Sequence, residues 1–204
     1  HSRLTNAAQP YVYSGYDIFV AEVASLVNET LLTDYLLKTI EEESFRLHVL
    51  DEAIERFRST LFRQTMFADF EHQIHNVVES GGALTPDRFD EIYKNIKGEF
   101  YKPVEMDNYI KMEWMRIPHF YYNYYVYQYA TGISAAMSLA QSIIVGGGDR
   151  KEKYISFLRS GSSEYPLELL KETGVDMRSK RPIEKSITVY NDYLSEMESI
   201  IEGE

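Results

Sequence analysis

Two glutamates near the beginning of the chain have the type and spacing of metal-binding carboxylates. Glu22 lies in the apolar stretch 18–24, and Glu29 follows it by seven residues, about two helical turns. Both carboxylates are therefore expected on one face of a helix. A carboxylate among apolar residues needs a cation or hydrogen-bond donors, so Glu22 could bind a metal while Glu29 orients another ligand. The competing interpretation is a pair of surface glutamates, which this spacing also produces on exposed helix faces.

A histidine followed by a run of tyrosines forms the second candidate site. After His119, six tyrosines fall within nine residues: Tyr121, Tyr122, Tyr124, Tyr125, Tyr127 and Tyr129. Tyrosine hydroxyls beside an imidazole can donate hydrogen bonds to a developing oxyanion or hold a peptide carbonyl. The alternative is a buried aromatic helix whose hydroxyls find structural partners. The residues by themselves leave both interpretations open.

His72 and His75 are three residues apart and could face one metal ion from a single helix. No third ligand accompanies them at a recognised spacing, so solvated helix histidines are the favoured interpretation. A different metalloenzyme that uses this pair is a rival hypothesis, and it predicts that His72→Ala releases the metal.

The composition limits the partners of the chain. Its net charge of −11 argues against a nucleic-acid partner, because binding a polyanion requires Lys and Arg to neutralise phosphates. No run of about 18 apolar residues occurs, so no membrane-spanning segment is predicted. Cysteine is absent, which excludes disulfides and cysteine zinc sites and fits a reducing cytoplasm.

The elements that must position these residues are predicted to be helices. Apolar residues recur at helical spacing along most of the 204 residues, and no alternating strand pattern of useful length occurs. Thr85 and Pro86 have the types expected at a helix cap and first turn. We therefore predict an all-α fold in one helical unit, 1–204, with an irregular segment at 1–15. The expected helices cover residues 17–37, 42–80, 86–96, 108–115, 119–145, 151–158 and 166–171, and a last helix opens at Pro182.

Short segments spread over nearly the whole chain match one peptidase family in order. They resemble the segments that follow the zinc-binding HExxH helix in oligoendopeptidase F-like peptidases, bacterial members of the thimet oligopeptidase group. The matching segments are 10–14, 18–25, 60–68, 116–122, 125–132, 165–167 and 174–177. The resemblance implies the multi-helix C-terminal part of a zinc metalloendopeptidase catalytic domain that hydrolyses oligopeptides.

The resemblance also implies roles for the candidate residues. In the family, two histidines of HExxH bind zinc, its glutamate activates water, and a glutamate on the next helix is the third ligand. By resemblance that ligand is Glu22, and Glu29 supports a zinc-bound histidine. His119 and the tyrosines that follow it match the group that binds substrate and stabilises the tetrahedral intermediate. The sequence 124–127 resembles the YYxY of thimet-type relatives, but its distance from His119 is shorter, so the role could fall on any of Tyr121, Tyr122, Tyr124, Tyr125 and Tyr127.

The chain departs from the family pattern because HExxH occurs nowhere in its 204 residues. His1-Ser2 fits the pair that trails this motif in the family, so the catalytic base and two zinc ligands are expected in a missing N-terminal part of the same protein. Catalytic zinc needs three protein ligands, and the isolated piece is therefore predicted to be inactive. The alternative from another functional class is a non-catalytic helical module that binds peptides or proteins.

Overall fold

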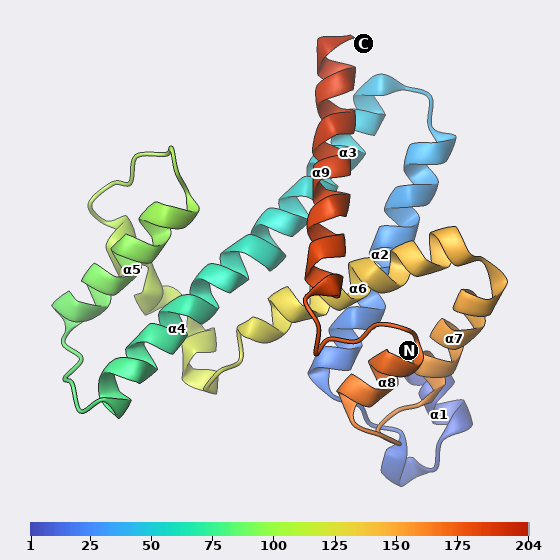
Figure 1. Ribbon diagram of the computed structural model, residues 1–204, viewed down its shortest axis with the longest axis horizontal. Coiled ribbons are helices and arrows are strands. Elements are labelled where there is room, and N and C mark those ends of the chain that lie inside the picture. The colour runs from blue at the N-terminus through green and yellow to red at the C-terminus, as the bar shows by residue number, and fades with distance from the viewer. Residues whose placement is uncertain (204) are drawn as a thin grey trace. The chain divides into compact units, whose positions relative to one another are not determined.

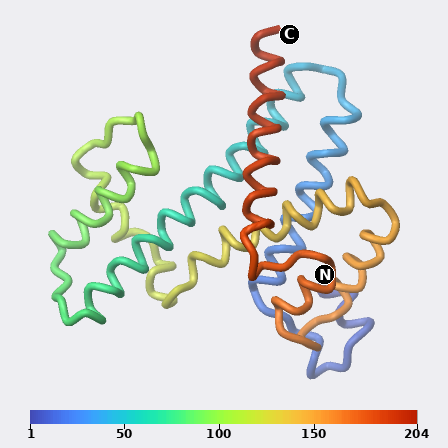
Figure 2. Tube along the Cα trace, viewed as in Figure 1, coloured from blue at the N-terminus to red at the C-terminus, as the bar shows by residue number. Residues whose placement is uncertain are grey.

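The computed structural model describes residues 1–203, and every regular element in that range is a helix (Figures 1 and 2). The all-α prediction is confirmed. The residues group into two compact units: unit 1 consists of His1–Arg58 and the chain from Thr131 onward, and unit 2 consists of Ser59–Ala130. Both are helical, and a single domain across the chain stays a prediction.

Unit 1 holds the first candidate glutamates. Its helices are α1 (Ser2–Ala8), α2 (Ile18–Thr39), α3 (Glu43–Phe57), most of α6 (Tyr127–Gly146), α7 (Gly148–Arg159), α8 (Pro166–Glu172) and α9 (Arg181–Glu202). Helix α3 packs against α2 and α9, and α7 packs against α1 and α8. Helix α2 buries Val20, Val23 and Val27, the three- and four-residue spacing by which a helix presents one apolar stripe to a core.

Unit 2 holds the histidine and the tyrosines. It contains α4 (Arg63–Glu79), α5 (Pro86–Phe100), the 3₁₀ helices η3 (Ile110–Arg116) and η4 (Pro118–Tyr122), and the first turn of α6. Helix α5 packs against α4 and η3. The core of the unit consists of Met66, Phe67, Phe70, Ile92, Tyr93, Ile96 and Val126. Thr85 caps α5 as predicted, because its Oγ1 accepts a hydrogen bond from the Arg88 amide at 3.3 Å.

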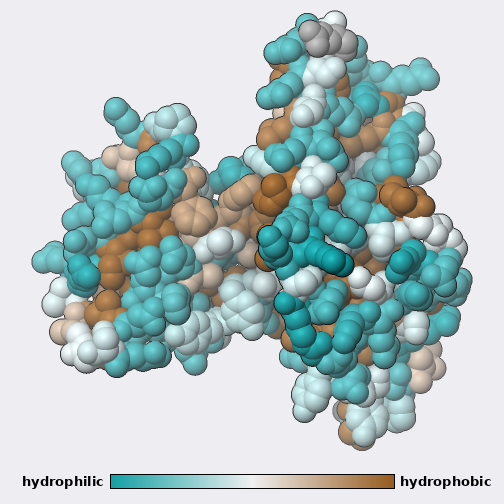
Figure 3. Space-filling view, in the orientation of Figure 1, coloured by the Kyte–Doolittle hydropathy of each residue, from teal (hydrophilic) through white to brown (hydrophobic). Residues whose placement is uncertain are grey.

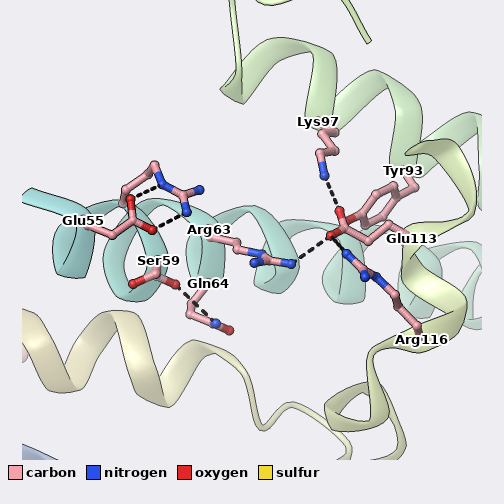
Figure 4. Close-up of polar contacts among 9 residues, drawn as sticks. Glu55, Ser59, Arg63, Gln64, Tyr93, Lys97, Glu113 and Arg116 are labelled. Atoms are coloured by element: carbon pink, nitrogen blue, oxygen red, sulfur yellow. Dashed lines mark hydrogen bonds and ion pairs between the residues drawn. The ribbon is translucent and has the colours of Figure 1, made fainter. Parts of the chain in front are cut away.

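The helix predicted over 42–80 is interrupted by a π-helical turn at Arg58–Phe62, which separates α3 from α4. A π turn holds more residues than an α turn and shifts the carbonyls out of the regular hydrogen-bond pattern. The side chain of Gln64 donates to the Ser59 carbonyl at 3.4 Å within this region (Figure 4). No Gly or Pro marks the place, so the sequence pattern could not signal the interruption.

The helix predicted over 119–145 is wrong in its first third. Residues 118–122 form the short 3₁₀ helix η4, Asn123 and Tyr124 have positive φ values of 37° and 55°, and α6 begins only at Tyr127. The buried carboxylate of Glu71 accepts a hydrogen bond from the Tyr124 amide at 2.7 Å. A long-range contact from α4 therefore occupies an amide that a continuous helix would have used for its own hydrogen bond.

Two smaller differences have tertiary causes as well. The segment predicted to be irregular contains α1, where the Thr5 hydroxyl donates to the Leu158 carbonyl at 2.9 Å and Gln9 to the Arg159 carbonyl at 3.0 Å. Helix α5 continues to Phe100 rather than ending near 96, because the buried Lys97 in its last turn forms an ion pair with Glu113. The two α1 contacts join residues 153 and 150 positions apart, and the Lys97–Glu113 pair joins residues 16 apart.

Helix α6 is the one described helix long and apolar enough to cross a membrane by length and composition alone. A core helix of a soluble protein meets the same criterion, and α6 is buried continuously from Gly132 to Ala140. In Figure 3 hydrophilic residues occupy most of the visible face of each unit, in line with the 26% of charged residues in the chain.

Candidate active-site residues

Glu22 lies in the second turn of α2, as the sequence pattern requires. Its side chain is half-buried, between the fully buried Val20 and Val23 on the same helix. No ion pair or hydrogen bond joins its carboxylate to another residue within 1–203. A partly desolvated carboxylate without a protein cation is a suitable metal ligand, because a bound cation would supply the missing partner.

Glu29 lies two turns further along α2, on the face that Glu22 shares. Its side chain is 49% exposed, and its carboxylate forms an ion pair with Arg56 of α3, Nε to Oε2, at 2.8 Å. An exposed pair of this kind adds little to stability. In this structure Glu29 is therefore oriented toward an arginine of unit 1.

No group of three or more His, Cys, Asp or Glu side chains in the described part of the chain is arranged to hold a metal ion. The pair on α4 is engaged separately: His72 is exposed and contacts Asn76 at 3.0 Å, whereas the His75 ring packs on that of Tyr124 with centroids 4.4 Å apart. Catalytic zinc takes three protein ligands and a water. Of these, Glu22 can provide one.

Three aromatic side chains of unit 2 form a compact cluster, which we call the His119 cluster: His119, Tyr125 and Tyr129. The His119 and Tyr125 rings are stacked, with centroids 5.7 Å apart and planes 12° apart, and Tyr129 meets His119 edge-on at 5.8 Å. The Tyr129 hydroxyl lies 3.4 Å from His119 Nε2 and donates to the Tyr125 hydroxyl at 3.3 Å. An imidazole and two phenols are thus gathered in one place, and the Tyr125 hydroxyl, which accepts from Tyr129, keeps its own proton for another oxygen atom.

The other candidate tyrosines lie outside this cluster. Tyr121 and Tyr122 are 87% and 66% exposed, although the Tyr122 ring contacts that of Tyr125 at 5.7 Å. Tyr124 packs on His75, and Tyr127 is half exposed in the first turn of α6. The family resemblance implies no role for Tyr129, the last tyrosine of the run. The signal in the sequence is its four-residue distance from Tyr125, because residues four apart share a face of the helix predicted over 119–145.

Sequence reasoning missed the buried ionic cluster that holds the segment before His119 (Figure 4). Glu113 of η3 is only 7% exposed and is surrounded by donors from three elements. Its partners are the Tyr93 hydroxyl at 2.7 Å, Arg63 at 2.8 Å, Arg116 at 2.9 Å and the ammonium of Lys97.

The charge state of Glu113 follows from these partners. Burial opposes the charge, but hydrogen bonds from Lys97, Tyr93 and Arg116 outweigh it and lower the pKa of Glu113 to about 2. Burial and the same carboxylate raise the pKa of Tyr93. Glu113 therefore stays ionised at neutral pH. It ties η3 to α4 and α5 six residues before His119.

A second contact fixes the same segment. The indole of Trp114 donates to Asp90 of α5 at 3.0 Å, and Lys111 forms an ion pair with that carboxylate at 3.1 Å. The hydrogen bond from Trp114 and the contacts from Lys111 lower the pKa of Asp90. Two carboxylates, Glu113 of η3 and Asp90 of α5, therefore hold the segment that precedes His119.

An all-helical fold, an available carboxylate on α2 and a histidine–tyrosine cluster agree with a metallopeptidase. Residues 1–189 match the model of peptidase family M3, and the chain belongs to that family. The sequence is 49% identical over 202 residues to oligopeptidase PepF of Bacillus subtilis and 43% identical to the group B oligopeptidase PepB of Streptococcus agalactiae, in each case over 98% of this chain. The resemblance to oligoendopeptidase F inferred from the sequence is confirmed.

Solved structures show the same relationship. The crystal structure of oligoendopeptidase F from Enterococcus faecium matches all of this chain with a TM-score of 0.90 at 41% identity. The crystal structure of a peptidase described as putative, from Chlamydophila abortus, matches 98% of the chain with a TM-score of 0.91, also at 41% identity. The chain spans about a third of each relative: 30% of the Bacillus protein, 34% of the Streptococcus protein and 38% of the Enterococcus chain.

Proposed function

We propose that this chain supplies part of the active site of a zinc metalloendopeptidase that hydrolyses oligopeptides. Membership of peptidase family M3 supports the reaction class, and the names of the relatives, oligopeptidase and oligoendopeptidase, support the substrate class. The observation that carries the proposal is the half-buried carboxylate of Glu22, which has no protein partner within residues 1–203. Such a group is costly to desolvate unless a cation completes its environment.

Glu22 is proposed as one zinc ligand, and Glu29 as the group that orients a neighbouring ligand. For that role Glu29 has to exchange its ion pair with Arg56 for a hydrogen bond to a ligand histidine. Bound zinc would lower the pKa of its water to about 7 and so provide a hydroxide nucleophile at neutral pH. The other two ligands and the general base are proposed to come from residues outside these 204, in another part of the same protein.

The His119 cluster is proposed to bind the substrate carbonyl and to donate hydrogen bonds to the oxyanion of the tetrahedral intermediate. Tyr125 is the favoured donor among the tyrosines, because it stacks on His119 and shares a hydrogen bond with Tyr129. Loss of one such donor typically lowers kcat by about a hundredfold or more. The exposed Tyr121, Tyr122, Tyr124 and Tyr127 are left for contacts with the peptide on either side of the scissile bond.

The proposal is tested by Glu22→Gln in the full-length protein that contains this chain. Zinc content is measured by elemental analysis, and activity is measured with a quenched oligopeptide. We expect Glu22→Gln to lose its zinc and at least a hundredfold in kcat/KM, because a neutral amide is a poor zinc ligand. Glu43→Gln, at the exposed start of α3, is the matched control and should retain both zinc and activity.

The outcomes separate the proposal from its rivals. A non-catalytic binding module predicts no zinc, no cleavage and unchanged peptide binding in Glu22→Gln. A metal site built on His72 and His75 predicts zinc loss in His72→Ala instead. We further expect the 204-residue piece on its own to cleave nothing at added zinc, since it offers a single proposed ligand. Zinc-dependent cleavage by that piece would contradict this part of the proposal.

A further inference from the structure

The backbone between His119 and α6 adopts a conformation that needs outside support. Asn123 and Tyr124 both have φ in the left-handed region, at 37° and 55°. Residues with a side chain disfavour this region, and consecutive positions of this kind persist only where surrounding contacts hold them. Tyr124, an aromatic residue, is less suited to it than Asn123, whose short side chain tolerates positive φ.

Glu71 provides the contact that holds this turn. It lies on α4, it is 1% exposed, and its Oε1 accepts a hydrogen bond from the Tyr124 amide at 2.7 Å. One turn further along α4, the ring of His75 packs on the ring of Tyr124 at 4.4 Å. Helix α4 therefore contacts both the backbone and the side chain of Tyr124.

The residues on either side of the turn, Phe120 and Val126, are packed in the core of unit 2. Phe120 contacts Phe67 and Phe70 of the core at 5.5 and 5.2 Å, and Val126 is fully buried in the same core. The chain is thus held in the core on both sides of the turn. Residues 121–124 between these two contacts are exposed, and Tyr125 is half-buried. The direction in which Tyr125 leaves this turn depends on the backbone at Asn123 and Tyr124.

We propose that Glu71 is a positioning residue: by accepting the Tyr124 amide hydrogen bond, it fixes the left-handed turn that stacks Tyr125 on His119. Its catalytic consequence rests on the proposed function, whereas its effect on the turn does not.

The chemistry of Glu71 agrees with a role other than packing. Within residues 1–203 no lysine or arginine forms an ion pair with it, and burial raises its pKa, against which the Tyr124 amide and the charge of His75 act. A buried carboxylate that no lysine or arginine pairs with is unfavourable for stability. An apolar side chain of similar size would fill the same space but would leave the Tyr124 amide without an acceptor.

Three substitutions of Glu71 in the full-length protein separate the effect of its side-chain length from the effect of its charge. Glu71→Gln keeps the length and an acceptor oxygen, Glu71→Asp keeps the charge but is one methylene shorter, and Glu71→Leu fills the space without an acceptor. Hydrogen exchange at the Tyr124 amide reports the turn directly. We expect Gln to protect this amide as Glu71 does, and Asp and Leu to speed its exchange at least tenfold.

Peptidase kinetics of the same variants report the catalytic consequence. Glu71→Asp and Glu71→Leu should lower kcat by about ten- to a hundredfold with little change in KM, because a displaced donor acts on the transition state rather than on ground-state binding. Glu71→Gln should retain kcat within about threefold, since it keeps the geometry that orients the donor. Asp69→Asn, two residues earlier on α4, is the matched control and should behave as the unsubstituted protein.

Each outcome decides the inference. An unchanged hydrogen-exchange rate of the Tyr124 amide in Glu71→Leu overturns the positioning role of Glu71. Full peptidase activity of Glu71→Leu also overturns it, provided that His119→Ala is impaired. If His119→Ala retains activity, the proposed function of the cluster fails, and amide exchange still decides the positioning. If the Leu variant does not fold, the Gln and Asp variants decide the inference by themselves. Glu71→Gln keeps the side-chain length and loses the charge, whereas Glu71→Asp keeps the charge and loses the length.

Discussion

Three glutamates of this chain lie in different surroundings. Glu22 is half-buried without a partner in the described residues and is proposed to bind a metal. Glu71 is fully buried and accepts from one amide, whereas Glu113 is buried among cations and a phenol. A carboxylate saturated by protein donors cannot bind a metal without losing them. Of these three described residues, only Glu22 is half-buried with a carboxylate that no protein donor contacts.

The pKa of Glu113 predicts an acid-sensitive unit 2. Because its partners lower this pKa to about 2 from the ordinary 4.5, the unfolded chain binds the proton more tightly than the folded chain does. The stabilisation is therefore complete above pH 4.5 and is lost as the pH falls from there toward about 2. Chemical denaturation between pH 2 and 7 should show a decline of about 2 kcal/mol from this group.

Glu113→Gln should remove that decline and lower stability at pH 7 by about 3 kcal/mol, because the buried Lys97 is left without its counter-charge. The control is Glu99→Gln, whose exposed pair with Lys102 should contribute less than about 0.5 kcal/mol. An unchanged midpoint of denaturation in Glu113→Gln would show that the cluster does not stabilise the fold.

At the scale of elements, α4 provides most of the contacts that hold the chain around the His119 cluster. It contributes Arg63 to the Glu113 cluster, Phe67 and Phe70 to the contact with Phe120, and Glu71 to the turn. Arg63, Phe67 and Glu71 follow one another at four-residue spacing, and Phe70 follows Phe67 by three, so these residues lie on one side of the helix. A π turn at Arg58–Phe62 precedes α4 in the chain.

Helix α5 depends on its capping residue at the start. Thr85 Oγ1 satisfies an amide that has no partner inside the helix, so Thr85→Ala should destabilise the protein by about 1 kcal/mol. Thr85→Ser retains the hydroxyl and serves as the control, with a stability close to that of the unsubstituted protein. Urea denaturation monitored by circular dichroism measures the difference, and an Ala variant equal to the Ser variant would show that the cap is dispensable.

At the scale of the whole molecule, the longest unbroken buried run within residues 1–203 is the middle of α6. Its residues from Gly132 to Ala140 are mostly small, with Ala135 and Ala136 fully buried. Small side chains let neighbouring backbones approach, and they leave no space for extra methylenes in a close-packed interior. This explains how a helix apolar enough to resemble a membrane span can be the core of a helical protein.

Ala136→Leu tests this tight packing. The added volume should force neighbouring side chains out of their preferred rotamers and lower stability by about 1–3 kcal/mol. Ala8→Leu, at the exposed end of α1, is the control, and its effect should stay within about 0.5 kcal/mol. Thermal denaturation compares the two variants. Equal melting temperatures would show that the interior around α6 can accommodate the larger side chain.

The sequence by itself determined the helical class, the position of most helices, the Thr85 cap and the shared face of Glu22 and Glu29. These features depend on residues within one or two turns of each other, so local spacing encodes them. The tertiary structure decided the π turn, helix α1, the Glu113 cluster and the left-handed turn before α6. Glu71 and Tyr124 are 53 residues apart, and a hydrogen bond over that distance outweighs the local helical preference of the tyrosine run. No periodicity within the run can reveal a partner that lies on another helix.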